Sequence, residues 1–377
     1  MKVLVVSSAP LIPSGNRWKA YSPYVKEMEI WNKHAGELQF CSPTWETNRG
    51  LLVKTIPFST PNNIILKDFD IKSFGQLFNA MNAAVQNSVK IFKAMRQANH
   101  IHLRCPGNIG LLGAIVQIAF PNTPKTAKYA GNWDPNSAQP WSYRLQKWIL
   151  SNTFLTKNMQ VLVYGEWDGS TENIKPFFTA TYNESDKIPI IAKDFLGTIR
   201  FLFIGTLSHG KRPQYAIALV EQLQQMGYNV KLDYYGEGNE RTVLEKIIAE
   251  KQLQTQVTLH GNMPSETIRN AYQHSHFLIL PSQSEGWPKV VAEAMFWGCL
   301  PIVSPVSCVP NMLDKGERGI VLTMENGKDV QQIKNLLDNE DIYQSQVLKA
   351  EEWSRKYTLD YFEEEIEKLV HLKSLKK

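Results

Sequence analysis

Residues 276–298 read HFLILPSQSEGWPKVVAEAMFWG, in which an apolar run, a short polar loop and a helix-like pattern follow one another. The run at 276–281 is short and bounded by turn residues, which predicts a buried strand. Pro288 favours the first turn of a helix, because the amide that proline lacks would have no partner there. A buried strand that feeds a helix through a tight loop is the repeating unit of a parallel α/β sheet.

The same alternation of short strands and longer helices continues from end to end of the chain. Predicted strands lie at 2–8, 38–42, 52–58, 100–105, 125–130 and 160–165 in the first half, and at 200–205, 230–236, 256–261, 300–304 and 319–323 in the second. The clearest predicted helix covers 74–95, and the apolar residues expected to form its one buried stripe are Phe74, Leu77, Phe78, Met81, Val85 and Phe92. The predicted fold class is therefore α/β.

Length and composition predict two globular domains. The 377 residues exceed what one hydrophobic core usually serves, and the chain is 43% hydrophobic and 20% charged, as ordinary globular proteins are. A polar stretch with Pro and Gly at 181–197 interrupts the alternation, which is typical of a linker. We expect a Rossmann-like domain at 1–184, a linker at 185–198, a second Rossmann-like domain at 199–355 and a helix at 356–377.

Charge and cysteine content exclude several classes of protein. A net charge of +5 is modest for this length and does not predict a nucleic-acid partner. The four cysteines, Cys41, Cys105, Cys299 and Cys308, are spaced neither as zinc ligands nor as a disulfide framework.

With no long apolar window and no signal-like start, a cytoplasmic protein is expected. The basic, leucine-containing end KLVHLKSLKK (368–377) is a candidate for peripheral contact with the inner face of a membrane.

The loop at 284–288 has the composition of an anion site. Gly286 allows close approach of a ligand to the backbone, and the amides of Trp287, Lys289 and Val290 would point at an anion along the helix dipole. Glu285 and Glu293 are placed to accept hydrogen bonds from a polyhydroxylated ligand. Either glutamate alone is more simply a cap or a solvated helix residue, but the combination favours a binding site.

The segment EGWPKVVAEAM (285–295) closely resembles the E-x7-E signature of glycosyltransferase family 4, whose members have the GT-B fold and retain anomeric configuration. The resemblance implies two Rossmann-like domains facing across a cleft, with a C-terminal helix that crosses back to the first domain. It also implies that Glu285 contacts the donor sugar and Glu293 the nucleotide ribose. The family usually has glycine where this chain has Pro288.

A second segment, FLFIGTLSHGKRP (201–213), resembles the family's G-R-L-x-x-x-K-G element, in which an Arg and a Lys bind the donor diphosphate. Gly205 and Lys211 fit this pattern. Thr206 replaces the family's Arg, and Arg212 replaces the following Gly and is expected to supply the second positive charge. A fixed cation stabilises a leaving nucleoside diphosphate because negative charge grows there in the transition state.

Weaker matches extend this resemblance over residues 200 to 325. DYYGEGNE (233–240) resembles the family's G-x-G turn, and LHGNMP (259–264) the turn that lines the base, which implicates Asn262 and Met263. Ser282 resembles the family's Pro-Ser.

The first domain departs further from the family. Ser14 and Gly15 resemble a reduced Gly-rich loop. No His follows the strand in KTAKYAGNWDP (125–135), so Asn132 or Asp134 is the expected substitute. Arg104 is either an acceptor-binding group or half of a structural ion pair.

With these residues, the sequence predicts a metal-independent transferase that moves a sugar from a UDP- or GDP-sugar to a glycan or lipid-linked acceptor, in surface polysaccharide biosynthesis. Retention of anomeric configuration is implied by the family resemblance. The histidine pairs His100/His102 and His274/His276 are typical of packing and capping, so no metal cofactor is expected. The alternatives are a sugar-nucleotide epimerase of the same architecture and a non-catalytic sugar-nucleotide-binding protein. A nicotinamide enzyme is disfavoured because Arg241 stands where G-x-G-x-x-G requires glycine.

Overall fold

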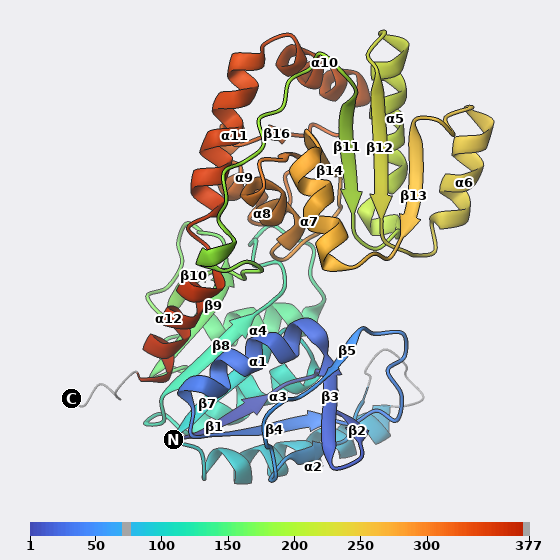
Figure 1. Ribbon diagram of the computed structural model, residues 1–377. Helices are drawn as coiled ribbons and strands as arrows, with labels where there is room; N and C mark the ends of the chain where they lie inside the picture. Colours follow the sequence, from blue (N-terminus) through green and yellow to red (C-terminus); the bar gives the residue numbers. More distant parts are fainter. Residues whose placement is uncertain (70–76, 372–377) are drawn as a thin grey trace. The chain divides into compact units, whose positions relative to one another are not determined.

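The protein divides into two compact units, each an α/β structure built on a parallel sheet (Figure 1). The computed structural model describes residues 1–69 and 77–371. Unit 1 comprises Met1–Phe177 and Phe362–Lys377, and unit 2 comprises Phe178–Tyr361. The prediction of two Rossmann-like α/β units is confirmed. None of the helices in the described ranges has the length and apolar character needed to cross a bilayer.

Unit 1 is built on a seven-stranded parallel sheet with the strand order β10-β9-β8-β7-β1-β4-β6. Its strands are β1 (Lys2–Val6), β4 (Glu37–Pro43), β6 (Ile64–Leu66), β7 (His100–Cys105), β8 (Lys125–Tyr129), β9 (Met159–Tyr164) and β10 (Ile174–Phe177). A small antiparallel sheet contains β2 (Ile12–Ser14), β3 (Arg17–Tyr21) and β5 (Val53–Thr55). The strand predicted at 52–58 therefore lies outside the main sheet, and only three of its residues pair.

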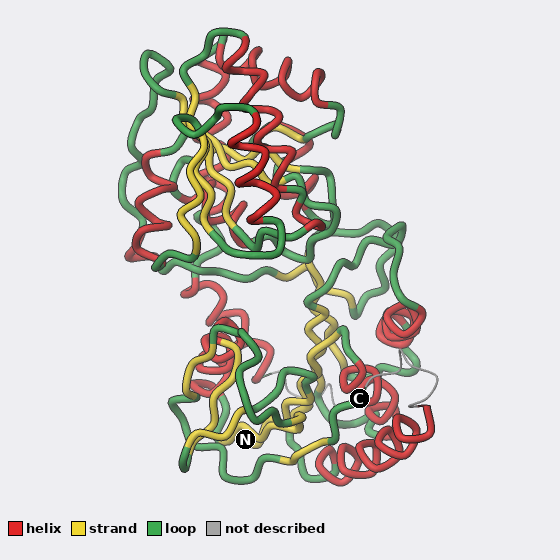
Figure 2. The backbone as a smooth tube through the Cα atoms, turned by 90° about the vertical axis from the view of Figure 1, so that its right-hand side faces the viewer, coloured by secondary structure: helices red, strands yellow, loops and turns green. Residues whose placement is uncertain are grey.

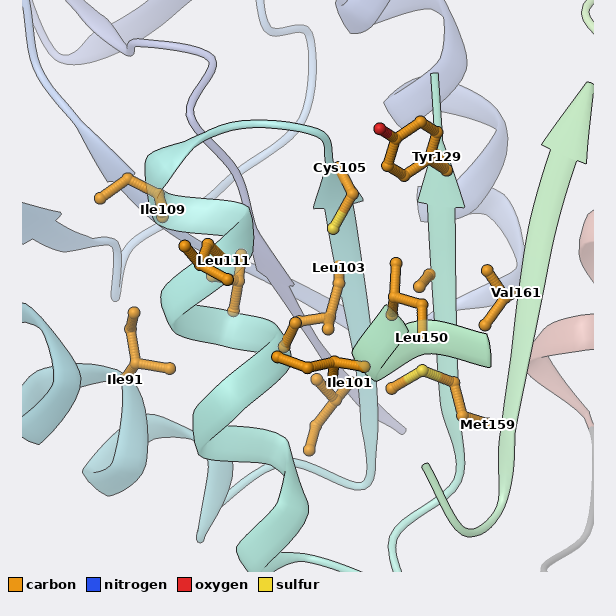
Figure 3. Packing of buried hydrophobic residues seen from close by; sticks show 14 of the residues in the cluster. Ile91, Ile101, Leu103, Cys105, Ile109, Leu111, Tyr129, Leu150, Met159 and Val161 are labelled. Carbon is orange, nitrogen blue, oxygen red and sulfur yellow. The ribbon is translucent and has the colours of Figure 1, made fainter. Parts of the chain in front are cut away.

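Helices cover both faces of this sheet. They are α1 (Ser22–His34), α2 (Leu77–Met95), α3 (Asn108–Val116), the 3₁₀ turn η2 (Gln117–Ala119), α4 (Trp141–Ser151) and α12 (Leu359–Val370). Successive side chains of β7 point to opposite faces of the sheet. Ile101 and Leu103 belong to the core beneath α2, α3 and α4, whereas His102 packs on Trp31 of α1 with ring centroids 4.2 Å apart. Figure 3 shows the first of these faces, with Leu111 of α3 and Leu150 of α4 beside β7.

The buried stripe predicted on α2 is wrong. Val85 is 63% exposed, and Met81 and Phe92 are exposed as well, while Phe74 lies outside the described residues. The buried face is an alanine-rich one instead, and its residues are Ala80, Ala83, Asn87, Ile91, Ala94 and Met95. Asn87 fits there because its side chain both donates to and accepts from the backbone of Lys67. Close packing on the sheet thus selects the alanine face and leaves the larger apolar side chains outside.

Unit 2 is built on a six-stranded parallel sheet with the order β13-β12-β11-β14-β15-β16. The strands are β11 (Ile199–Ile204), β12 (Val230–Tyr235), β13 (Val257–Gly261), β14 (Phe277–Leu280), β15 (Leu300–Val303) and β16 (Ile320–Val321). The helices are α5 (Pro213–Gln225), α6 (Arg241–Glu250), α7 (Ser265–His274), α8 (Lys289–Phe296), α9 (Val309–Met312), α10 (Asn326–Leu337) and α11 (Glu340–Ser354). Three 3₁₀ turns complete the unit: η3 (Glu184–Asp186), η4 (His209–Lys211) and η5 (Asp314–Gly316).

The strand order places a topological switch point between β11 and β14. From β11 the chain adds β12 and β13 on one side, and β14, β15 and β16 are added on the other. Loops that follow the two central strands of such a sheet leave in opposite directions and open a crevice at its carboxyl edge. The segments singled out in the sequence, 205–213 and 282–290, are these two loops.

The segment at 181–197, expected to be a linker, belongs to unit 2 and packs on its other elements. The Lys193 ammonium donates to the carbonyl of Gly298 over 2.7 Å, and the Phe195 ring lies 4.8 Å from that of Tyr343. Apart from η3, this segment is loop, and Figure 2 shows the loops of both units in green. Beyond unit 2, α12 continues into unit 1, where the Phe362 ring lies 5.5 Å from that of Phe177.

Candidate active site

Lys211 and Glu285 meet at the switch point of unit 2. Lys211 ends η4 after β11, Glu285 lies in the loop between β14 and α8, and their side chains form an ion pair. The two loops are also joined by their backbones, since the Gln283 amide donates to the Gly210 carbonyl over 2.8 Å. The Lys211 side chain is 27% exposed and that of Glu285 is 10% exposed, so the pair is partly desolvated but open to a ligand.

Glycines allow the loop after β12 to rest directly on the loop after β11. A Cβ atom at Gly236 would lie 2.0 Å from the Gly205 carbonyl oxygen, and one at Gly238 would lie 2.2 Å from that of Leu207. The Leu207 amide donates to the Glu237 carbonyl over 3.0 Å at the same place. The G-x-G turn therefore supports the segment that carries Lys211, which explains why glycine is needed at both positions.

Arg212 adopts a left-handed backbone conformation, with φ 48° and ψ 49°, at the N-cap of α5. This conformation favours glycine, which explains why glycine is usual there in the family that the sequence resembles. Arg212 forms no ion pair with any residue of the described ranges. Thr206, which replaces the expected arginine, is exposed. Arg212 is therefore the available second cation beside Lys211.

The loop before α8 is fixed by contacts on both sides. The Gly286 carbonyl accepts hydrogen bonds from Ser307 Oγ over 3.0 Å and from Cys308 Sγ over 3.2 Å. The Trp287 ring packs on α11, where its centroid lies 6.2 Å from that of Trp353. Pro288 is the N-cap residue rather than part of the first turn, so Lys289 and Val290 open the helix. The side chain of Trp287 thus anchors the loop, and only its backbone is placed for the proposed anion contact.

Ser282, expected in the site, is fully buried after β14. Its Oγ has no hydrogen-bond partner in the described part of the protein, and its carbonyl accepts from Ser304 Oγ over 2.5 Å. A buried hydroxyl without a partner is unfavourable. The Ser282 hydroxyl is therefore available to form a hydrogen bond with a ligand at the end of β14.

Both oxygens of the Glu293 carboxylate are held by other residues of unit 2. Thr181 Oγ1 donates to Oε1 over 2.7 Å, and the Tyr272 hydroxyl donates to Oε2 over 3.1 Å. Burial, and then the Glu293 charge, raises the pKa of Tyr272 well above its ordinary value, so the hydroxyl stays a donor. A carboxylate has about four acceptor sites, so a ribose contact is still available to it. Sequence reasoning missed Thr181 and Tyr272, which no local pattern connects to Glu293.

Asn262 and Met263, expected near the base, lie exposed at the end of β13. Beside them, His260 Nε2 lies 2.7 Å from Asp233 Oδ1, and the His260 ring stacks on Tyr235 with centroids 4.6 Å apart. This stacked pair was not predicted. Neither VKLDYY (230–235) nor VTLHG (257–261) has a pattern that predicts it.

Arg104 of unit 1 is found in an ion pair, the second of its two predicted roles. It pairs with Glu27, and Lys128 Nζ lies 3.1 Å from the same carboxylate. Burial alone would raise the pKa of Glu27, but Arg104 and then Lys128 outweigh it and lower that pKa to about 2. Glu27 therefore remains charged, and Arg104 is engaged in a structural ion pair with it.

The remaining candidates of unit 1 lie in turns. Gly15, with φ 59°, forms the exposed turn of the β2–β3 hairpin. The side chain of Asn132 accepts from the Asp134 amide over 2.9 Å, and that of Asp134 accepts from the Asn136 amide over 2.8 Å. Lys147 donates to the Asp134 carbonyl over 3.0 Å. Asn132 and Asp134 therefore shape a rigid loop after β8.

One group of side chains has the geometry of possible metal ligands. Atoms of His34, Glu367 and His371 lie within 4.8 Å of one another on α1 and at the end of α12. His34 already lies 3.2 Å from Glu363 and 4.0 Å from Glu367, so ion pairs account for the arrangement. The predicted packing role of His100 and His102 is supported, since both rings are buried and bonded to Thr126 Oγ1 at 2.9 and 2.8 Å.

Part of the chain is similar to known glycosyltransferases. Residues 186–353 match the model of glycosyl transferases group 1. The chain is similar to alpha-D-kanosaminyltransferase of Streptomyces kanamyceticus, 26% identical over 37% of each chain. It is also similar to the uncharacterized glycosyltransferase MJ1178 of Methanocaldococcus jannaschii, 25% identical over 50% of this chain and 51% of the relative. The chain thus spans about a third to a half of the length of these relatives.

Solved structures resemble the whole chain. Sucrose-phosphate synthase from Thermosynechococcus elongatus has a TM-score of 0.66 at 17% identity, with 98% of both chains covered. Anabaena Alr3699/HepE, solved with UDP and glucose, has a TM-score of 0.68 at 14% identity, with 98% of this chain and 99% of that one covered. The match to the glycosyl transferases group 1 model thus lies within unit 2, and the fold of the chain is that of the GT-B glycosyltransferases.

Proposed function

We propose that the protein transfers a sugar from a UDP- or GDP-sugar to a glycan or lipid-linked acceptor, with retention of anomeric configuration and without a metal cofactor. The observation that carries this proposal is the Lys211–Glu285 pair at the switch point of the family-matched unit. Relatives named as glycosyltransferases, and a structural neighbour that binds UDP and glucose, support a nucleotide-sugar donor.

In the proposed reaction, Lys211 and Arg212 hold the donor diphosphate. When the donor enters, its phosphate replaces Glu285 as the partner of Lys211, and the Glu285 carboxylate turns to a sugar hydroxyl. The acceptor hydroxyl oxygen then bonds to the anomeric carbon, and its proton passes to a phosphate oxygen of the leaving diphosphate. The electron pair of the breaking bond between the anomeric carbon and the phosphate oxygen passes to the same diphosphate. Lys211 stabilises this charge as it grows, and the amides that open α8 add their dipoles.

The proposed acceptor contacts are Asn132 and Asp134 in the rigid loop after β8, because Arg104 is engaged by Glu27. We further propose surface polysaccharide synthesis, at the inner face of a membrane, as the setting of the reaction. A lipid-linked or growing glycan acceptor would be available there.

Nucleotide binding is the first test. Thermal unfolding should be followed with UDP, GDP, ADP and CMP, since a ligand at 100 times its dissociation constant stabilises a protein by about 2.7 kcal/mol. One of UDP or GDP should raise the midpoint, and Lys211→Ala should reduce the shift, while Lys246→Ala, at an exposed residue of α6, should leave it unchanged. A chain that responds to none of the four nucleotides is not a nucleotide-sugar transferase.

Product analysis separates transfer from the alternatives. An epimerase releases nucleoside diphosphate and a free or isomerised sugar without any acceptor product, and a binding protein shows a thermal shift without turnover. The proposed transferase yields an acceptor with one added sugar. Its activity should persist in EDTA, because the charge of Lys211 replaces that of a metal ion.

A further inference from the structure

An exposed apolar surface covers the outer side of three helices in unit 1. We name it the α2–α4 face, and its large exposed apolar residues are Met81, Val85, Val89, Phe92, Ile115, Ile118, Trp141, Trp148 and Phe154. Helices α2 and α3 contact each other, as do α3 and α4, so their outer sides share one direction. Soluble monomers rarely expose contiguous apolar surface on this scale without a function for it.

On α2, the exposed residues form a true stripe. Met81, Val85 and Val89 follow at four-residue steps and Phe92 follows three residues later, which places them on one side of the helix. The buried side lies opposite, with Ala83 and Ile91 against the sheet. The helix therefore has a second apolar side that the fold of unit 1 does not use.

The stripe continues across to α3. The Phe92 ring lies 5.0 Å from the ring of Phe120, which directly follows η2. Ile115 and Ile118 are exposed on the same connection. Aromatic contact thus joins the apolar surface of α2 to that of α3 and η2.

Helix α4 adds the most protruding aromatic residues. Trp141 and Trp148 are seven residues apart, two helical turns, and share one side of the helix. Phe154 follows the helix and is 75% exposed, with Lys157 Nζ 5.1 Å from its ring centroid. Tryptophan and lysine on the rim of an apolar surface are typical of contact with the headgroup region of a bilayer.

The stretch of sequence that forms this surface is rich in basic residues and poor in acidic ones. Residues 77–157 contain nine Lys and Arg and a single acidic residue, Asp134, whereas the net charge of the whole chain is only +5. Five of these basic residues are exposed, namely Lys90, Lys93, Arg96, Arg144 and Lys157. Two copies joined through this face would bring like charges together, so the charge pattern disfavours self-association and favours an anionic partner.

We propose that the α2–α4 face docks the protein on an anionic lipid bilayer, with its aromatic and aliphatic side chains in the headgroup region and its basic side chains on the lipid phosphates. The inference concerns where the proposed transferase works, and it does not depend on the transfer reaction. It moves the membrane contact expected at 368–377 to the folded surface of unit 1.

Vesicle sedimentation with the full chain tests the proposal. Binding to vesicles of phosphatidylglycerol and phosphatidylcholine should be strong and should weaken with salt, while vesicles of phosphatidylcholine alone should bind little. The double variants Trp148→Ser/Phe154→Ser and Lys90→Glu/Lys93→Glu should each weaken binding on the order of tenfold. The matched control Leu196→Ser/Leu348→Ser removes exposed leucines of unit 2 and should bind as the parent does.

Three results would overturn the proposal. They are binding that does not depend on phosphatidylglycerol, parental binding by both face variants, and a dimer of the parent that the aromatic variant dissociates. Circular dichroism and the nucleotide thermal shift check that each variant is folded. Because the readout is binding, a failed transferase assay leaves this test valid, and failed vesicle binding leaves the proposed chemistry intact.

Discussion

Lys211 has only one charged partner among the described residues, and that partner, Glu285, is itself nearly buried. In the proposed reaction the lysine exchanges this carboxylate for a diphosphate whose charge grows in the transition state. Lys211→Ala should therefore lower kcat by more than it raises KM. A hydrogen bond to a charged group is worth about 1.5–3 kcal/mol, so the loss should be roughly tenfold to a hundredfold.

Steady-state kinetics on Lys211→Ala and Glu285→Gln checks this prediction. Glu285→Gln should impair transfer while nucleotide affinity stays near the parental value, because its proposed partner is the sugar. Lys231→Ala, on the exposed side of β12, is the matched control. Parental rates in both site variants would mean that the reaction takes place elsewhere.

Glu293 offers a second prediction, because its carboxylate has structural partners as well as a proposed ligand. Glu293→Ala leaves the buried Tyr272 hydroxyl without its acceptor, which should cost about 1–3 kcal/mol of stability even without nucleotide. Glu293→Gln keeps an acceptor for Tyr272 and should recover most of that stability. Both variants should still bind nucleotide more weakly, by roughly tenfold, if the carboxylate holds the ribose.

Denaturant unfolding without ligand and titration with nucleotide separate the two roles. Thr181→Val is the companion variant, because it frees one Glu293 oxygen without removing charge. If Glu293→Gln bound nucleotide as tightly as the parent, the role of Glu293 would be structural alone.

At the level of single elements, β7 makes the protein sensitive to acid. Burial lowers the pKa of His100 to about 4, and that of neighbouring His102 lies well below its ordinary value for the same reason. Between pH 6.5 and 4 the unfolded chain binds a proton at His100 that the folded chain does not. Stability should therefore fall as the pH falls through this window, by up to about 3 kcal/mol for His100 alone.

Denaturant unfolding at pH 7.5, 6 and 5 measures the slope of the free energy of unfolding against pH. His100→Gln should flatten it, whereas His371→Gln, which alters an exposed histidine, should not. A slope that is the same in His100→Gln as in the parent would contradict a neutral buried imidazole.

The order of elements was predictable, but their packing was less so. Short runs of apolar residues, bounded by turn residues, predicted the central strands of both sheets, and Lys211 and Glu285 followed from the loops after two of them. The two- to four-residue strands β2, β6, β10 and β16 depend on pairing with distant strands, and only β16 overlaps a predicted strand. On α2, periodicity predicted a single apolar stripe, but the side that packs on the sheet carries Ala83, and the predicted side is exposed at Met81 and Val85. The contact of Thr181 with Glu293 joins residues 112 apart and has no local signal.

For the molecule as a whole, α12 ties the end of the chain into unit 1. Ile366 is fully buried, and Lys128 Nζ lies 5.1 Å from the centroid of the Phe362 ring. Ending the chain after Trp353 would uncover the buried Glu27–Lys128 pair and the apolar surface around Phe177, so the truncated protein should be insoluble or strongly destabilised. Buried phenylalanine-to-alanine changes cost about 3–5 kcal/mol, and Phe362→Ala should lower the thermal midpoint accordingly.

Ending the chain after Val370 is the matched control, since it removes no residue that the structure places in the core. Expression, solubility and the unfolding midpoint of the two truncations should differ sharply. A chain ended at Trp353 that is as stable as the parent would show that unit 1 is complete without α12.

The chain crosses between the units twice, at Phe177–Phe178 and again at Tyr361–Phe362, so unit 2 is continuous in sequence and unit 1 is not. During synthesis on a ribosome, all of unit 2 therefore leaves the exit tunnel before the residues that complete unit 1 emerge from it. During that interval, the surface of unit 1 that Phe362 and Ile366 cover in the folded protein is exposed to solvent. A chaperone that recognises nascent chains should accordingly bind this protein at its amino-terminal unit, and release it only after the last helix has emerged.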